Sequence, residues 1–119
     1  MDNVGNSQYL KELAEGLASG QMRFDGLFVS GDVMAAEFIQ YASSLGIRIP
    51  EDVQVVGFDD TFVSELTTPA ITTIHQPLRE MAESAAEMLV RAVKEKDTPS
   101  SVVLPVSLMR RGSTSWKSN

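Results

Sequence analysis

One stretch of this sequence constrains the fold more than any other: residues 53–60 read Val-Gln-Val-Val-Gly-Phe-Asp-Asp. A valine-rich run without strict alternation is typical of a strand that is buried on both faces of a parallel sheet. Gly57 then lets the backbone leave the strand sharply, and Asp59 and Asp60 follow at its carboxyl end. Ligands of open α/β sheets bind at that end. The stretch therefore predicts an α/β fold with a polar site beside Asp59.

Helical and extended patterns alternate along the rest of the chain. Apolar residues at helical spacing predict helices over residues 7–19, 32–45 and 77–94. Gly20 and Gly46 are the predicted stops of the first two helices, and Pro77 is predicted at the first position of the third. Apolar and β-branched runs predict further strands over 27–29, 70–75 and 102–109. We expect one parallel-sheet lobe over 1–119, with a loop over 61–69 and frayed ends over 1–6 and 112–119.

Charge and composition exclude several classes of protein. The net charge is −6 and no helix-turn-helix pattern is present, so we expect this chain to make no direct contact with nucleic acid. The sequence has no cysteine, which excludes disulfides and thiolate metal sites and is compatible with a cytoplasmic location. No apolar run approaches the about 20 residues of a membrane span, and the start lacks a signal-peptide pattern. We expect no membrane association.

Asp59 and Asp60 leave several interpretations open. Two adjacent carboxylates at a strand end can form a general acid–base pair, a metal site, a polar-ligand site or merely solvated loop acids. A second small, acidic corner, Ser30-Gly31-Asp32, follows the strand over 27–29. Because neighbouring parallel strands end at the same edge, we predict that both corners share one rim of the sheet. For Asp32, helix N-cap is the favoured role and does not exclude a ligand contact.

Enzymatic alternatives have weak support in the sequence. The one histidine, His75, has no nucleophile beside it in the sequence, and the glycines fit neither a phosphate-binding loop nor a dinucleotide fingerprint. A phospho-receiver domain needs a lysine at a later strand end, but the lysines fall on predicted helices or the tail. We therefore predict no catalytic residue, no metal and no cofactor.

Two sets of apolar residues exceed what one sheet contact needs. The second predicted helix and the loop after it carry the first set, which forms either a dimer surface or part of the core: Met34, Phe38, Phe62, Val63 and Leu66. The helix over 77–94 carries the second set, a long apolar face that we expect to be buried against the chain's own sheet or against a second copy.

Several blocks of the sequence resemble the effector-binding core of the LacI/GalR family of transcriptional regulators. The resemblance extends over about residues 24–114, and the blocks keep the family's order and spacing. They are LFVSGDVMA at 27–35, LGIRIPEDV at 45–53, VVGFDD at 55–60, PAITTIHQP at 69–77 and LPVSLMRRGST at 104–114.

The resemblance implies a flavodoxin-like lobe of a periplasmic-binding-protein-like fold, namely its incomplete C-terminal subdomain. In that family two lobes close on a sugar, nucleobase or similar effector, and closure tunes the operator affinity of an attached DNA-binding headpiece. Asp59 matches the acid that accepts hydrogen bonds from effector hydroxyls. Gly31 replaces a frequent asparagine, and Leu78 replaces an aromatic residue of some sugar-binding members. The effector-binding residues implied are Ser30, Gly31, Asp32, Phe58 and Asp59.

The resemblance also implies partners and moving parts. The second helix and the 61–66 loop match the dimer interface, so we expect a homodimer. His75, Gln76 and Pro105 lie where the chain crosses between lobes. No headpiece is expected in this chain, and the intact regulator is expected to be a cytoplasmic protein and not an enzyme. A solute-binding protein of the same fold without a DNA role, and less readily a phospho-receiver domain, remain the alternatives.

Overall fold

The computed structural model describes residues 3–95, 98 and 100–116. The chain forms two compact units, one made of Met1–His75 with Leu108–Asn119 and the other made of Gln76–Ser107. The sequence predicted a single lobe over 1–119, and the α/β architecture is found in the first unit. That unit contains the candidate site.

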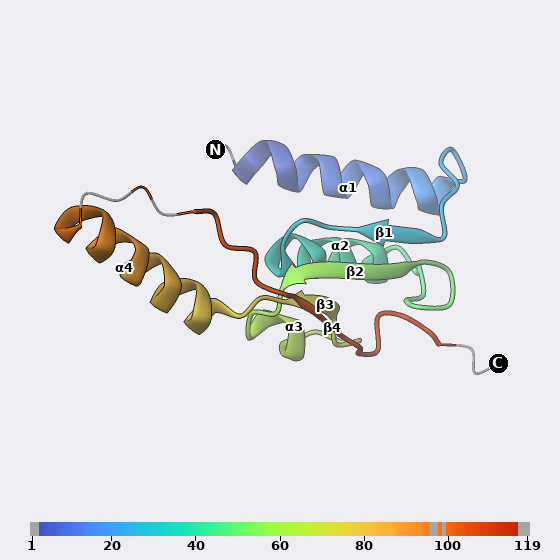
Figure 1. The fold of residues 1–119 in the computed structure, drawn as a ribbon. Coiled ribbons are helices and arrows are strands. Elements are labelled where there is room, and N and C mark those ends of the chain that lie inside the picture. The colour runs from blue at the N-terminus through green and yellow to red at the C-terminus, as the bar shows by residue number, and fades with distance from the viewer. Residues whose placement is uncertain (1–2, 96–97, 99, 117–119) are drawn as a thin grey trace. The chain divides into compact units, whose positions relative to one another are not determined.

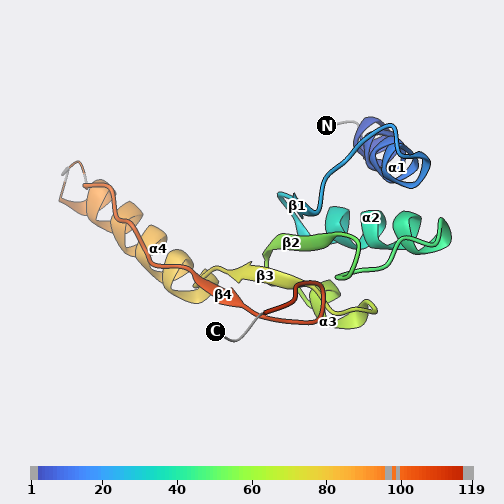
Figure 2. The same cartoon turned by 90° about the vertical axis from the view of Figure 1, so that its right-hand side faces the viewer.

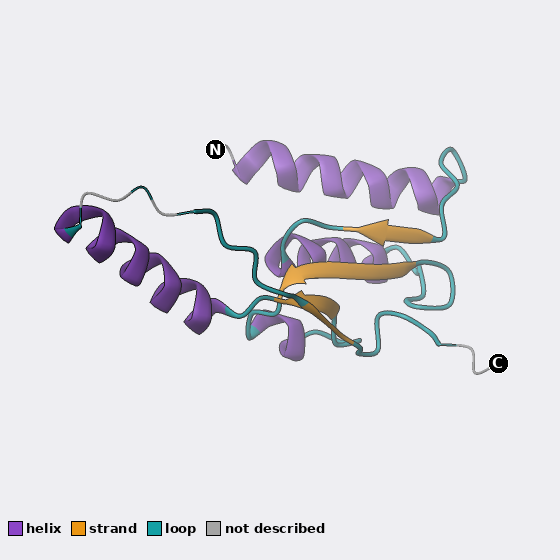
Figure 3. Cartoon of the chain, viewed as in Figure 1, coloured by secondary structure: helices purple, strands orange, loops and turns teal. Residues whose placement is uncertain are grey.

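The elements follow the predicted alternation of helices and strands (Figures 1 and 3). In chain order they are α1 (Asn3–Ser19), β1 (Gly26–Phe28), α2 (Asp32–Ser44), β2 (Gln54–Asp59), α3 (Val63–Leu66), β3 (Thr72–His75), α4 (Leu78–Lys94) and β4 (Ser107–Met109). The predicted 61–69 loop contains the short helix α3, and the last strand is shorter than predicted. Residues 3–6, which were expected to fray, belong to α1.

The sheet has the order β1-β2-β3-β4. β1 pairs with β2 in parallel, and β2 pairs in parallel with β3, with Val56 opposite Thr72 and Asp59 opposite His75. The prediction of an α/β lobe with a mainly parallel sheet is therefore confirmed. Parallel strands end at the same edge, so the segments after β1, β2 and β3 all leave from one rim.

One face of the sheet carries the core. Figure 2 shows α1 and α2 on the same side of the strands. Leu10 and Ala14 of α1, Phe38 of α2, and Val55 of β2 are among the buried residues of this cluster. Along β2 the buried residues alternate with partly exposed ones, so the prediction that this strand is buried on both faces is wrong in this chain. Both helices of the core pack against the same face, so the residues of the opposite face are less covered.

Glycine ends the first two helices as predicted. Gly20 follows α1 with a φ of 79°, and Gly46 follows the C-cap of α2 with a φ of 78°. A glycine tolerates this left-handed conformation without a steric penalty, which is why it commonly terminates helices. Pro77 differs from the prediction, because it is the N-cap of α4 and not its first helical residue.

The chain after β4 is fixed to the sheet, so the prediction of fraying is wrong for residues 112–116. Ser113 is fully buried, and its hydroxyl accepts from the Thr72 N–H at 2.8 Å and donates to the Val55 carbonyl at 2.6 Å. The Arg110 guanidinium lies 3.9 Å from the centre of the Trp116 ring. Hydrogen-bonding groups anchor this polar segment, which a search for apolar residues overlooks. Residues 117–119 lie outside the described part of the chain.

The apolar face of helix α4 is not covered by the chain's own sheet, which was one of the two predicted ways of burying it. None of its residues is buried, and Leu78, Leu89 and Val93 are 60%, 66% and 72% exposed. The amphipathic pattern of residues 78–94 therefore predicted the helix correctly, and burial of its apolar face against a second copy remains a prediction.

Candidate functional site

The two acidic corners of the sequence meet at the carboxyl rim of the sheet. Asp32, at the start of α2, accepts a hydrogen bond from the backbone N–H of Thr61, which follows β2, at 2.7 Å. It also accepts from the Thr73 hydroxyl of β3 at 2.6 Å. The prediction that the corners after β1 and β2 share one rim is therefore confirmed.

Asp32 has a structural role that the sequence did not predict. Gly31 is the N-cap of α2, in extended conformation and with no side-chain cap bond, so the prediction of Asp32 as the N-cap is wrong. The Asp32 carboxylate is buried at 1% exposure and takes its hydrogen bonds from within the chain. These bonds give the carboxylate a structural role, and its contact with an effector remains a prediction. The α-carbon of Gly57 lies so close to this carboxylate that a side chain there would clash with it.

The other predicted effector residues are at least partly accessible. Asp59 is the last residue of β2 and is half-buried, with a φ of 107°. Ser30 is exposed, whereas Gly31 and Phe58 are half-buried. The Phe58 ring contacts the Phe28 ring edge to face, with 6.4 Å between their centres. These residues offer a carboxylate, a hydroxyl and an aromatic ring near one rim, and their contact with an effector remains a prediction.

Asp60 lies at the centre of a charged network beside Asp59. One of its carboxylate oxygens accepts from Arg111 at 2.8 Å, and the other lies 2.8 Å from Nδ1 of His75. The side chains of Asp60 and Arg111 are only 12% and 14% exposed. Burial by itself raises the pKa of Asp60, but the hydrogen bonds and positive charges of Arg111 and His75 outweigh it, so the pKa lies below its ordinary value.

The network reaches further through Arg111, a residue that the sequence analysis missed. Its guanidinium also donates to the Ser64 hydroxyl at 2.9 Å and to the Ile71 carbonyl at 3.1 Å. A second acid, Glu65, lies 3.4 Å away. The sequence does show that Asp60 follows a strand and that Arg111 is a cation in the last block that resembles the family. It does not show that these two distant residues contact each other.

The predicted dimer residues divide between the core and the surface. Phe38 is fully buried in the core, which is the core alternative that the sequence left open, and Met34 packs against the same cluster. Phe62 and Leu66 are 76% and 71% exposed, and Val63 is half-buried. A helical stripe alone does not tell a core face from an interface face, which is why the sequence left the place of Phe38 open.

A groove between α2 and the residues that directly follow Leu66 adds an exposed residue that was not predicted. It has a volume of about 460 Å³ and is lined by α2 and by residues 67 and 68. Val33, which is 56% exposed, lies on its α2 side together with Ala36 and Ile39.

The residues predicted at the lobe crossovers lie close to the division between the two units. The first unit runs to His75 and the second begins at Gln76. The chain returns to the first unit at Leu108, shortly after Pro105. The division thus falls next to the predicted crossovers, while their action as hinges remains a prediction.

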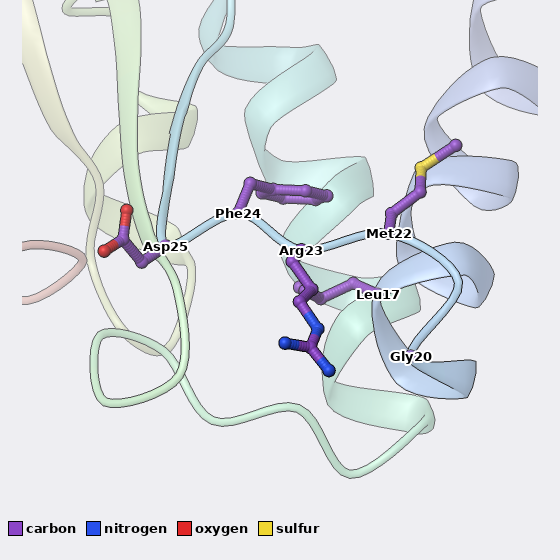
Figure 4. A pocket seen from close by; sticks show the side chains of 6 residues that line it. All are labelled: Leu17, Gly20, Met22, Arg23, Phe24 and Asp25. Atoms are coloured by element: carbon purple, nitrogen blue, oxygen red, sulfur yellow. The ribbon is translucent and has the colours of Figure 1, made fainter.

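Two further cavities lie along α1 and β1. The one in Figure 4 has a volume of about 480 Å³ and is lined by Leu17, Gly20, Met22, Arg23, Phe24 and Asp25. These residues precede β1, so the cavity lies at the opposite end of this strand from Ser30 and is separate from the predicted site. The other cavity is mainly apolar, has a similar volume of about 480 Å³, and extends from Tyr9 of α1 to Ser30.

The described residues show neither a metal-binding cluster nor a membrane-spanning helix. No three or more histidine or acidic side chains gather there in a way that can hold a metal ion. Within the same residues, no helix has both the length and the apolar character to cross a membrane.

The chain was compared with known proteins. Residues 3–114 match the periplasmic binding protein-like domain family. The chain is 39% identical over 84 residues to the HTH-type transcriptional repressor PurR of Vibrio vulnificus, an alignment that covers 71% of this chain and 25% of that repressor. The chain thus spans about a quarter of the length of this relative.

Solved structures show the same likeness. The transcriptional regulator CelR in complex with cellobiose is 32% identical, with a TM-score of 0.80, over 91% of this chain and 32% of that one. The lac repressor dimer bound to operator and the anti-inducer ONPF is 28% identical, with a TM-score of 0.78, over 92% of this chain and 37% of that one.

Proposed function

The chain belongs to the periplasmic binding protein-like family, as part of a LacI/GalR-type effector-binding domain, and on this basis we propose that it supplies half of the effector cleft of a ligand-responsive transcriptional regulator. We further propose that it supplies the regulator's dimer surface. The regulator is proposed to act in the cytoplasm and to catalyse no reaction. The relatives named above include two repressors. This supports a regulator and speaks against the alternative of a solute-binding protein without a DNA role.

The observation that carries the proposal is the position of Asp59. It ends β2 at the rim where β1 and β3 also end, next to the exposed Ser30 corner. A partly desolvated carboxylate accepts strong hydrogen bonds from hydroxyl or N–H groups, which sugars and nucleobases both carry. The half-buried Phe58 adds an apolar ring close to that carboxylate in the sequence. This combination supports a small, polar, uncharged effector.

Calorimetric titration of the full-length regulator that carries this sequence tests the cleft. Cellobiose, sucrose, lactose, adenine and guanine are titrated in turn, and we expect at least one to bind. Asp59→Ala is expected to abolish the binding heat while the circular dichroism spectrum stays unchanged. Asp25→Ala is the matched control, since Asp25 is an exposed acid at the opposite end of β1 and should leave affinity intact. Unchanged affinity in Asp59→Ala contradicts the proposed cleft.

The dimer surface is proposed to consist of Val33, Phe62 and Leu66 with the groove beside them. Val33 lines this groove, Leu66 directly precedes its lining residues 67 and 68, and exposed large apolar side chains of this kind favour association. The lac repressor, a structural neighbour, was solved as a dimer. By this proposal, two copies of the chain pack α2 and α3 of one against α2 and α3 of the other.

Sedimentation velocity tests this surface. Leu66→Lys is expected to shift the full-length regulator toward the monomer, because association would bury the lysine charge in an apolar contact. Val103→Lys is the control, since Val103 is 93% exposed and lies away from the proposed surface in sequence and in unit. Equal dimer dissociation constants for the two variants rule out this surface as the interface.

A further inference from the structure

The turn after β2 has a backbone conformation that L-amino acids seldom adopt. Asp59 has a φ of 107° and Asp60 a φ of 55°, and among the described residues these are the non-glycine positions with positive φ. Such conformations persist only where the surroundings enforce them, and they concentrate at ligand sites. Some group in the structure therefore has to hold this turn.

The carboxylate of Asp60 is held from two sides. Arg111 donates to one oxygen at 2.8 Å, His75 lies 2.8 Å from the other, and Ser64 adds a contact at 3.3 Å. The backbone N–H of Asp60 points to the Thr73 hydroxyl at 3.4 Å. With its side chain 12% exposed, Asp60 has little freedom to rotate away from these partners.

Arg111 is itself rigid enough to act as an anchor. Its guanidinium bonds the Ile71 carbonyl and the Ser64 hydroxyl in addition to Asp60. Its backbone N–H donates to the Thr72 hydroxyl at 2.8 Å, and that hydroxyl donates back to the Arg111 carbonyl at 3.0 Å. The cation is therefore fixed at both its head and its backbone, and a planar guanidinium binds a carboxylate with a defined orientation.

We infer that Asp60 is a positioning residue for Asp59: its ion pair with Arg111 and its hydrogen bond with His75 hold the positive-φ turn that presents the Asp59 carboxylate. This inference rests on the proposed function, in which Asp59 contacts the effector. The inference also connects the turn at the rim of the sheet with the two places where the chain passes between the units. His75 is the last residue before the unit Gln76–Ser107, and Arg111 comes shortly after that unit ends. The Asp60 carboxylate thus contacts one residue just before the second unit, His75, and one residue shortly after it, Arg111. Both contacts are made at the turn that carries Asp59.

Backbone NMR of this chain tests the inference without an effector. Asp60→Asn keeps the shape of the side chain but removes its charge, and we expect the carbon and nitrogen shifts of residues 59 and 60 to move toward values typical of negative φ. Arg111→Gln should give the same change, whereas Arg111→Lys, which keeps the charge, should restore part of the original shifts. Asp52→Asn is the matched control, because it breaks the exposed ion pair between Asp52 and Arg48.

A purely structural role for Asp60 predicts a different pattern. It would lower the urea midpoint of Asp60→Asn while the shifts of residue 59 stay as in Asp52→Asn, and that outcome overturns the inference. If Asp60→Asn does not fold, His75→Asn serves instead. It removes the other partner of the carboxylate at a site where the histidine side chain is 51% exposed. Unchanged shifts of residue 59 in that variant overturn the inference in the same way.

Affinity provides a second readout in the full-length regulator. For the compound of the panel that binds, Asp60→Asn should weaken binding by about tenfold although Asp59 is intact. The reason is that a carboxylate displaced from its position makes weaker hydrogen bonds to the compound. Affinity within twofold of Asp52→Asn overturns the inference. If no compound of the panel binds the unsubstituted regulator, the proposed function fails, while the NMR result still decides whether Asp60 holds the turn.

Discussion

Replacing Ser113 with alanine removes a hydroxyl group that joins β2 to β3 where their ladder begins. That hydroxyl accepts from the N–H of Thr72 and donates to the carbonyl of Val55, and all three residues are fully buried. In Ser113→Ala the Thr72 N–H is left without a partner in a place that water does not reach. An unsatisfied buried donor costs about 1–3 kcal/mol, and the Val55 carbonyl loses a hydrogen bond as well.

We therefore expect Ser113→Ala to lower the free energy of unfolding by about 2–3 kcal/mol. With a urea dependence of about 1–3 kcal/mol per molar for a protein of this size, the midpoint falls by about 0.7–3 M. The assay is urea unfolding followed by far-UV circular dichroism, with hydrogen exchange of the Thr72 amide as a local readout. That amide should exchange faster in the variant, because its hydrogen-bond acceptor is gone.

Ser115→Ala is the matched control for this prediction. Ser115 is exposed, and it is its backbone N–H that donates to the Gln54 side chain, so removal of its hydroxyl should change little. If Ser113→Ala unfolds within about 0.5 kcal/mol of this control, which is the usual effect of a surface substitution, then Ser113 does not bridge the two strands as described.

Three further predictions concern the rim and the core. The lowered pKa of Asp60 implies a contribution to stability that is complete above the ordinary aspartate pKa of about 3.9 and is lost as the pH falls toward the lower folded-state value. Asp60→Asn should flatten this acid limb in urea midpoints measured from pH 5 down to pH 2, and an unchanged slope argues against the ion pairs. Gly57→Ala should lower the melting temperature, since the added methyl group clashes with the Asp32 carboxylate and overpacking costs about 1–3 kcal/mol. Phe38→Ala should cost about 3–5 kcal/mol in urea unfolding, whereas Phe62→Ala, at a highly exposed position, should stay within about 0.5 kcal/mol of the unsubstituted chain under monomeric conditions.

Local patterns in the sequence were sufficient to predict the strands and the shared rim. The valine-rich run of β2, the glycine stops of α1 and α2, and the acidic corners each depend on a few neighbouring residues. The parallel arrangement then follows from the alternation of helices and strands, because a strand-helix-strand unit with parallel strands nearly always has a right-handed crossover. Asp32 and Thr61 meet for this reason, although they are far apart in the chain.

What the sequence could not predict depends on contacts between distant residues. Phe38 belongs to an apolar stripe that fits a core or an interface equally well, and only its packing in the cluster decides. Ser113 stands in a polar tail whose composition suggests fraying, yet its hydroxyl completes the ladder between two strands. Arg111 pairs with Asp60, which lies 51 positions earlier in the chain. None of these three has a local sequence signature.

The rim of this sheet is held by polar groups more than by apolar packing, and this has a consequence for function. Asp32, Asp60 and Arg111 each join segments that leave different strands, through charge-assisted hydrogen bonds in partly or fully buried places. Such bonds are directional, so they fix the angle of a turn more tightly than apolar contacts of similar strength. A carboxylate that has to meet a small polar molecule needs that angular precision more than it needs extra stability. We therefore expect single polar substitutions at the rim to alter ligand affinity at a smaller cost in stability than substitutions in the core around Phe38.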